Sequence, residues 1–409
     1  MEEPPTVDDD VSIGTSILMQ FSDFRREAHH QLRAVIVGIS HGIIEQNLSP
    51  TPAAYLAATC SSLRLLDVEK PTVIEALLKI LSLVIPKVSA AKLMDEIELV
   101  SQSLVHVLGW PDSLTESSAL SAIKCVSLLL ITIGNRIDDW SDSSAATFSG
   151  LYGCLMAFVT HYPFQVRLQL WSCLCDVLRS FQGTMLIEPV SEAITALFKK
   201  WFPCGEPIAV GSQGRIVAYP GMFVLDTLVE CLFLMPTKYK LAILNDFKIL
   251  LELRFSVTTI RITNCLHKLC VNNPSPDVPP QLLLDLLCSL SYSVYKNESQ
   301  EHDPIFTARL LKIGVAKVYS SNRQICVMKL PIVFNAFKGI MGQTNDSGEP
   351  VEEHHYTAVH SFKRLIHACI DESLIKEGVD QILIDANANI DASKSHISTI
   401  YNRTSLCYY

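Results

Sequence analysis

Apolar and polar residues follow one another along most of the chain with the period of an α-helix. The segment from Thr237 to Arg254 shows this clearly, because its apolar residues recur three and four positions apart and form one wide stripe. The stripe consists of Tyr239, Ile243, Leu244, Phe247, Leu250 and Leu251. A single helix cannot bury such a stripe. A partner helix and the neighbouring pair must cover it, at about 1.5 to 3 kcal/mol per large side chain removed from water.

The same pattern predicts one helix after another from about residue 15, separated by short turns rich in Pro, Asn, Ser, Asp and Gly. In the first half we expect helices over residues 52–66, 71–85, 89–108, 115–133, 145–160, 163–181 and 188–201. In the second half we expect the pairs 221–234 with 237–254, 257–271 with 280–295, 304–320 with 325–341, and 352–370 with 373–387. Local signals mark several ends: Thr51 and Ser89 are expected N-caps, Pro52 suits a first turn, and Gly183 closes a helix.

The later pairs begin about every 35 to 50 residues, which matches HEAT and armadillo units. We therefore predict an all-α fold, a HEAT- or armadillo-like α-solenoid of antiparallel helix pairs. The predicted parts are a disordered acidic N-terminus (1–14), a first helical array (15–202), an irregular loop (203–219), a second array (220–388), and a C-terminal tail that is disordered or truncated (389–409).

Two arginines fit a further feature of HEAT units. Val166-Arg167 and, less clearly, Ile260-Arg261 place an apolar residue and an arginine near the start of a predicted helix. In HEAT units the arginine of such a pair reaches an acidic group of the adjacent repeat. We therefore assign Arg167 and Arg261 a structural role.

Composition narrows the class of protein. Hydrophobic residues make up 49% of the chain and charged residues 18%, which excludes global disorder. The net charge of −9 argues against a dedicated nucleic-acid clamp. The longest apolar run, 126–133, is shorter than the roughly 18 residues of a membrane span, so we expect no membrane partner.

The cysteines number 13, and we interpret them as reduced core thiols of an intracellular protein, because they lie in apolar helical stretches and no secretory signal precedes them. Examples are Cys60, Cys125, Cys231, Cys265, Cys288 and Cys369.

The motifs of catalysis and cofactor binding are missing from the sequence. It has no zinc-ligand spacing, no glycine-rich phosphate loop and no nucleophile elbow. The closest cysteine pair, Cys173 and Cys175, fits two buried helical thiols better than a metal site. We expect no enzyme activity, no catalytic, cofactor-binding or metal-ligating residue, no cofactor, and no small-molecule substrate.

Charged faces remain as candidate contact surfaces. Arg309, Lys312 and Lys317 follow helical spacing and are the first choice for a contact with RNA or an acidic partner. Lys363 and Arg364 are further candidates. They belong to a predicted helix on which Glu353, His360, Arg364, His367 and Asp371 share one face. A solvated polar face explains that row better than a metal site, since Arg364 would repel a cation.

Three long stretches resemble the amino-terminal HEAT region of the plant-type ribosomal RNA-processing protein twelve family. They are residues 51–63 (TPAAYLAATCSSL), 306–311 with 322–331 (FTARLL and NRQICVMKLP), and 370–381 (IDESLIKEGVDQ). Residues 250–254 and 261–263 are also similar to the family, so the resemblance covers nearly the whole chain, to about residue 388.

The resemblance implies a non-enzymatic HEAT-repeat scaffold in ribosome biogenesis. Such a protein acts in pre-ribosomal RNA processing and in maturation and nuclear export of ribosomal subunit precursors. It resides in the nucleus and nucleolus and shuttles to the cytoplasm. The implied partners are pre-ribosomal particles, through protein and ribosomal RNA, together with the Ran GTPase and nucleoporins. The alternative is an importin- or exportin-like transport receptor, since an acidic solenoid suits basic cargo.

Overall fold

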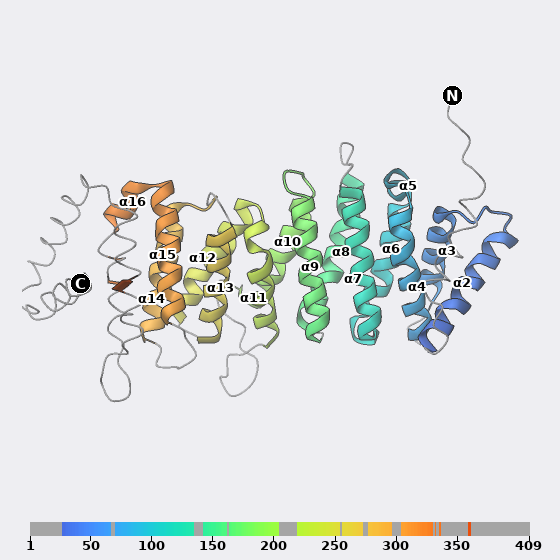
Figure 1. Ribbon diagram of the computed structural model, residues 1–409, viewed down its shortest axis with the longest axis horizontal. Helices are drawn as coiled ribbons and strands as arrows, with labels where there is room; N and C mark the ends of the chain where they lie inside the picture. Colours follow the sequence, from blue (N-terminus) through green and yellow to red (C-terminus); the bar gives the residue numbers. More distant parts are fainter. Residues whose placement is uncertain are drawn as a thin grey trace, which may run out of the picture. The chain divides into compact units, whose positions relative to one another are not determined.

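The computed structural model describes residues 27–66, 70–134, 142–161, 163–203, 219–253, 256–272, 277–296 and 304–329, with residues 332, 335, 336, 359 and 360. Every regular element in these ranges is a helix (Figure 1). The chain divides into two compact units, Met1–Asp246 and Phe247–Tyr409. The N-terminal 1–14, the tail 389–409 and the pair predicted over 352–387 lie outside the described residues, apart from 359 and 360.

The first unit contains most of the described helices. They are α2 (Glu27–Glu45), α3 (Pro52–Leu65), α4 (Pro71–Val84), α5 (Ala90–Asp95), α6 (Ile97–Leu108), α7 (Glu116–Gly134), α8 (Asp142–His161), α9 (Phe164–Ser180), α10 (Ile187–Trp201) and α11 (Tyr219–Cys231). Short 3-10 helices follow α4 (Ile85–Lys87), precede α7 (Pro111–Ser113) and follow α11 (Leu232–Leu234). The division between the units falls within α12 (Thr237–Leu253).

Helices of the first unit form two layers. In one layer α2, α4, α7, α9 and α11 each contact the next, and in the other α3, α6, α8 and α10 do the same. Consecutive helices, such as α2 with α3 and α8 with α9, contact each other across the layers. Figure 1 shows these helices following one another along the unit in chain order. The predicted fold class, antiparallel helix pairs stacked as in HEAT repeats, is confirmed.

Local sequence signals set where several helices begin and end. The Thr51 side chain accepts a hydrogen bond from the Ala54 N–H (3.2 Å) at the start of α3, and Ser89 accepts one from Lys92 (3.4 Å) at the start of α5. Gly183, just beyond the end of α9, has φ of +79°, a conformation that glycine adopts without strain. These three predicted boundary residues are confirmed.

One predicted helix is two helices. The sequence pattern predicts a continuous helix over 89–108, but the structure breaks it at Glu96 into α5 and α6. Both pieces contact α7, and α6 also packs against α3 and α8 in its own layer. The break therefore lets the chain pass from one layer to the other.

In the second unit α16 is described over Arg323–Met328, and most of its predicted extension to 341 lies outside the described residues.

The second unit repeats the pairing on a smaller scale. It includes α13 (Ser256–Asn272), α14 (Pro280–Lys296), α15 (Pro304–Ser321) and α16. α13 contacts α15, α14 contacts α16, and α15 contacts α14 and α16. The ammonium group of Lys329 donates to Asp285 on α14 (2.7 Å), which ties the chain after α16 back to α14.

The division between units differs from the predicted organisation, in which 203–219 separates two arrays. In the structure α11 contacts α8, α9 and α10, so the helix after this segment belongs to the first unit. Residues 204–218 themselves lie outside the described residues. The apolar side chains of α11, such as Leu225 and Leu228, explain the difference, because they are fully buried in the first unit's core.

The core of each layer is made of aliphatic side chains with thiols and small hydroxyls between the helices. The Cys125 thiol of α7 donates to the Leu78 carbonyl of α4 (3.2 Å), and the Ser103 hydroxyl of α6 donates to the Cys60 carbonyl of α3 (3.1 Å). Such small side chains let neighbouring backbones approach closely. The cysteines in the described part of the chain are free thiols, and all of them except Cys154 are buried. The predicted reduced core thiols are thus confirmed there; Cys369 lies outside it.

Helix α7 is the one described helix that is long and apolar enough to cross a membrane, by length and composition alone. More than half of its apolar window is buried, and it packs between α4 and α9. Its apolar character is accounted for by its place in the middle of a layer.

The close approach of α7 to the segment after α9 gives a first prediction. A Cβ atom added to Gly134 would lie 2.3 Å from Cε1 of Phe181, whose ring is buried and cannot swing away. We expect Gly134→Ala to lower the free energy of unfolding by about 1 to 3 kcal/mol, measured by urea denaturation. Gly153→Ala in α8 is the control, because nothing lies within 4 Å of the added atom; it should be neutral or stabilising. Equal effects of both variants would contradict the packing.

The buried thiols give a second prediction. Burial raises the pKa of Cys60 and of Cys173 from 9.0 to about 12. In the unfolded chain these thiols lose their protons near pH 9, whereas in the folded chain they keep them until about pH 12. The free energy of unfolding therefore keeps its full value below about pH 9 and falls as the pH rises from 9 toward 12. We expect the free energy of unfolding to fall more steeply between about pH 8 and pH 10.5 in the wild type than in a Cys60→Ala, Cys173→Ala double variant. Parallel pH profiles from urea denaturation would contradict this.

Candidate functional site

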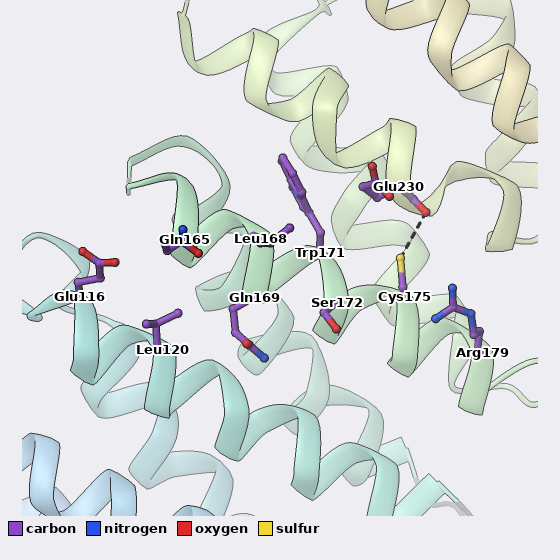
Figure 2. Close-up of a pocket in the computed structure, with 10 residues that line it drawn as sticks. All are labelled: Glu116, Leu120, Gln165, Leu168, Gln169, Trp171, Ser172, Cys175, Arg179 and Glu230. Carbon is purple, nitrogen blue, oxygen red and sulfur yellow. Dashed lines mark hydrogen bonds between the residues drawn. The ribbon is translucent and has the colours of Figure 1, made fainter.

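A surface pocket in the first unit is the strongest candidate for a site among the described residues. Its volume is about 750 Å³, and α7, α9 and α11 line it. Figure 2 draws its ten lining residues: Glu116, Leu120, Gln165, Leu168, Gln169, Trp171, Ser172, Cys175, Arg179 and Glu230.

The sequence of α9 explains why the pocket lies on the outside of its layer. One side of this helix carries Val166, Leu170 and Leu174, which are fully buried against the rest of the unit. The lining residues occupy the other side of the helix, in which Leu168 is 47% exposed. Helix α9 therefore carries two apolar surfaces, and the core uses only one.

Contacts between α9 and α11 hold the pocket wall in place. The indole Nε1–H of Trp171 donates to the Thr227 hydroxyl (2.9 Å), which in turn donates to the Phe223 carbonyl (2.9 Å). One turn further along α9, the Cys175 thiol donates to the Glu230 carbonyl (3.3 Å). One turn earlier, the guanidinium of Arg167 lies over the Phe223 ring, 3.8 Å from its centroid. Each successive contact lies one turn further along both helices. Helices α9 and α11 therefore lie side by side and run parallel.

Arg167 supports the pocket from beside it. Its guanidinium carbon lies 3.8 Å from the centroid of the Phe223 ring and 5.9 Å from that of the Phe164 ring. Burial lowers the pKa of Arg167, and the negative charge of Asp226 on α11 opposes that shift. The predicted structural arginine is therefore close to an aromatic and an acidic residue of the following pair, although its assignment as a HEAT-type arginine stays a prediction. Arg261 donates to the Val257 carbonyl of its own helix (3.3 Å).

Carboxylates give the pocket an acidic character. Glu116 and Glu230 contribute two negative charges, from α7 and α11. The one cation in the lining, Arg179, forms an ion pair with Asp176 (3.3 Å). This pair is exposed and adds little stability, but it offsets the positive charge of Arg179.

The basic residues predicted from the sequence lie elsewhere. Arg309, Lys312 and Lys317 are on α15 in the second unit, where Arg309 is exposed and the two lysines are half-buried. Arg309 and Lys312 lie on the side of α15 opposite its buried Leu310, Leu311 and Val318. Lys317 instead follows Leu310 on the same side of the helix, where its charge acts on the buried Cys270 thiol of α13. Helix α15 itself contains no acidic residue. Their contact role stays a prediction. Lys363 and Arg364 lie outside the described residues.

Sequence reasoning missed the pocket, although α9 carries a signal for it. Phe164, Leu168 and Trp171 are spaced as a second apolar stripe beside the stripe that fills the core. In the described ranges, no group of three or more His, Cys, Asp or Glu side chains is placed to hold a metal ion.

Comparison of the sequence with models of known protein families finds one family that it matches. A family model described as "RRP12-like, N-terminal HEAT repeats" matches residues 1–277, more than half of the chain. The matched range includes every helix from α2 to α12 as well as α13, and hence the pocket. No curated protein matches the chain.

The Trp171–Thr227 bond generates a prediction about the pocket wall. Thr227 is buried, so Thr227→Val keeps its shape but leaves the Trp171 N–H without this acceptor. We expect the free energy of unfolding to fall by about 1 to 2 kcal/mol in urea denaturation. Thr195→Val is the matched control, since the buried Thr195 hydroxyl bonds only its own helix, at the Ser191 carbonyl (2.8 Å). If Thr195→Val lowers the free energy of unfolding as much as Thr227→Val does, the hydrogen bond between Trp171 and Thr227 contributes nothing to stability.

Proposed function

The chain belongs to the RRP12-like family with N-terminal HEAT repeats, and from this membership we propose that it is a scaffold protein of ribosome biogenesis without enzyme activity. The match over residues 1–277 is the observation that carries the proposal. A stack of helix pairs suits this role, because each pair presents side chains to the surface and the successive pairs offer adjacent contact sites.

We further propose a more specific role within ribosome biogenesis. The chain acts in pre-ribosomal RNA processing and in the maturation and nuclear export of subunit precursors. It works in the nucleus and nucleolus and shuttles to the cytoplasm. Its partners are pre-ribosomal particles, with the Ran GTPase and nucleoporins as contacts during export. The resemblance of residues 51–63, 306–331 and 370–381 to the ribosomal RNA-processing protein twelve family supports this assignment.

Sedimentation of the tagged full-length chain tests the proposal. We expect the chain to sediment with large precursor particles and to co-purify precursor ribosomal RNA, and we expect its depletion to cause unprocessed precursor RNA to accumulate. Recovery only in light fractions, with normal precursor RNA after depletion, would refute the proposal. Direct, nucleotide-dependent binding of Ran in that same situation would instead assign the chain to the nuclear transport receptors.

A further inference from the structure

The pocket between α7, α9 and α11 exposes apolar surface that the fold itself does not use. Leu168, which lines the pocket, is 47% exposed, and Phe164, which lies outside the lining and one turn earlier on α9, is 54% exposed. The Phe164 ring meets the Trp171 ring edge-on at 6.0 Å between centroids, and Leu120 faces them from α7. Exposed apolar side chains gathered around a pocket offer an anchor point for a partner.

The pocket is formed before anything binds. Trp171 is fixed by its hydrogen bond to Thr227, and Cys175 by its bond to the Glu230 carbonyl. Both bonds link rigid helices, so a ligand does not have to order the wall of the pocket, and this saves affinity. Aromatic side chains held in this way are the usual energetic centres of protein interfaces.

Polar groups beside the apolar surface suit a polypeptide. The side-chain amides of Gln165 and Gln169 line the pocket one turn apart, and neither amide makes a hydrogen bond within the described part of the chain. An amide offers both a donor and an acceptor, which matches the alternating groups of a peptide backbone. Figure 2 shows the Gln169 side chain directed toward α7.

The charges of the lining residues indicate which kind of peptide segment the pocket binds. Glu116 and Glu230 lie on the α7 and α11 sides of the pocket, while Arg179 is already paired with Asp176. Glu116 is exposed and makes no ion pair with a described residue. Lysine or arginine on a bound segment would meet these carboxylates, whereas the phosphates of RNA would be repelled by them. A second copy of this chain, with its net charge of −9, is also disfavoured.

We propose that this pocket is the docking site for a short segment of a partner protein, in which an aliphatic or aromatic anchor is flanked by lysine or arginine. The anchor lies on Leu120, Leu168 and Trp171, its backbone bonds the glutamine amides, and its basic residues face Glu116 and Glu230. This inference deepens the proposed function by naming the chemistry of one partner, yet it can be tested on the purified chain alone.

Selection from a random 12-residue peptide display library on the full-length chain tests the proposal. We expect the selected peptides to carry an apolar anchor with adjacent lysine or arginine. Fluorescence polarisation then gives the affinity of labelled selected peptides for the wild type and the variants. Leu168→Ser should weaken binding about tenfold or more, and Glu116→Lys about threefold to tenfold, with the effect of Glu116→Lys shrinking as salt rises.

Two controls match these changes away from the pocket. Met185→Ser removes an apolar side chain that is 86% exposed in the turn after α9, and Glu192→Lys reverses an exposed charge on α10 in the other layer. Both should leave binding within about twofold of the wild type. Because Leu168 and Glu116 are exposed, their variants should fold, and circular dichroism checks this.

Several results would overturn the proposal. They are a library that yields no binder, selected peptides that are acidic or lack an anchor, and peptides that bind Leu168→Ser as tightly as the wild type. A wild-type dimer abolished by Leu168→Ser would assign the pocket to self-association, and labelled single-stranded RNA released by the same change would assign it to RNA. The sedimentation result does not enter these outcomes, so the two proposals can fail separately.

Discussion

Burial of aliphatic and aromatic side chains between successive helices of one layer is the interaction on which the rest of the structure depends. Leu78 of α4, Leu129 of α7 and Leu174 of α9 are fully buried in successive helices of the same layer. No pair can bury such residues by itself, so each pair is stabilised by the one before it and the one after it. Thiols and hydroxyls such as Cys125 and Ser103 bond carbonyls of the neighbouring helix and thereby keep these contacts short.

Stacking also explains why a candidate site lies where it does. A helix inside a layer contacts two neighbours and the opposite layer, which leaves one side free. On α9 that side carries Leu168, Gln169 and Trp171, and the hydrogen bond from Trp171 to Thr227 turns a contact between helices into a rigid wall. The same arrangement that builds the core therefore presents an ordered surface. Membership of the RRP12-like family fits a protein that works by such contacts.

Sequence reasoning succeeded where the cause is local. Periodicity located most helices, and Thr51, Ser89 and Gly183 mark boundaries because capping and a left-handed turn depend only on neighbouring residues. It failed where distant segments decide. The break at Glu96 lets α6 pack against α3 and α8, and the pocket joins α7, α9 and α11, which no spacing in the sequence relates. The contact role of the basic residues chosen from spacing, such as Arg309 on α15 of the other unit, stays a prediction.

Hydrogen exchange followed by mass spectrometry in a Leu129→Ala variant tests the stacking most directly. Leu129 is fully buried in α7, and its truncation should cost about 2 to 5 kcal/mol. If each pair is stabilised mainly by its neighbours, exchange should accelerate in α4, α7 and α9 and stay unchanged in α2, α3, α14 and α15. Equal acceleration in all of these helices would contradict stacking and point to one shared core.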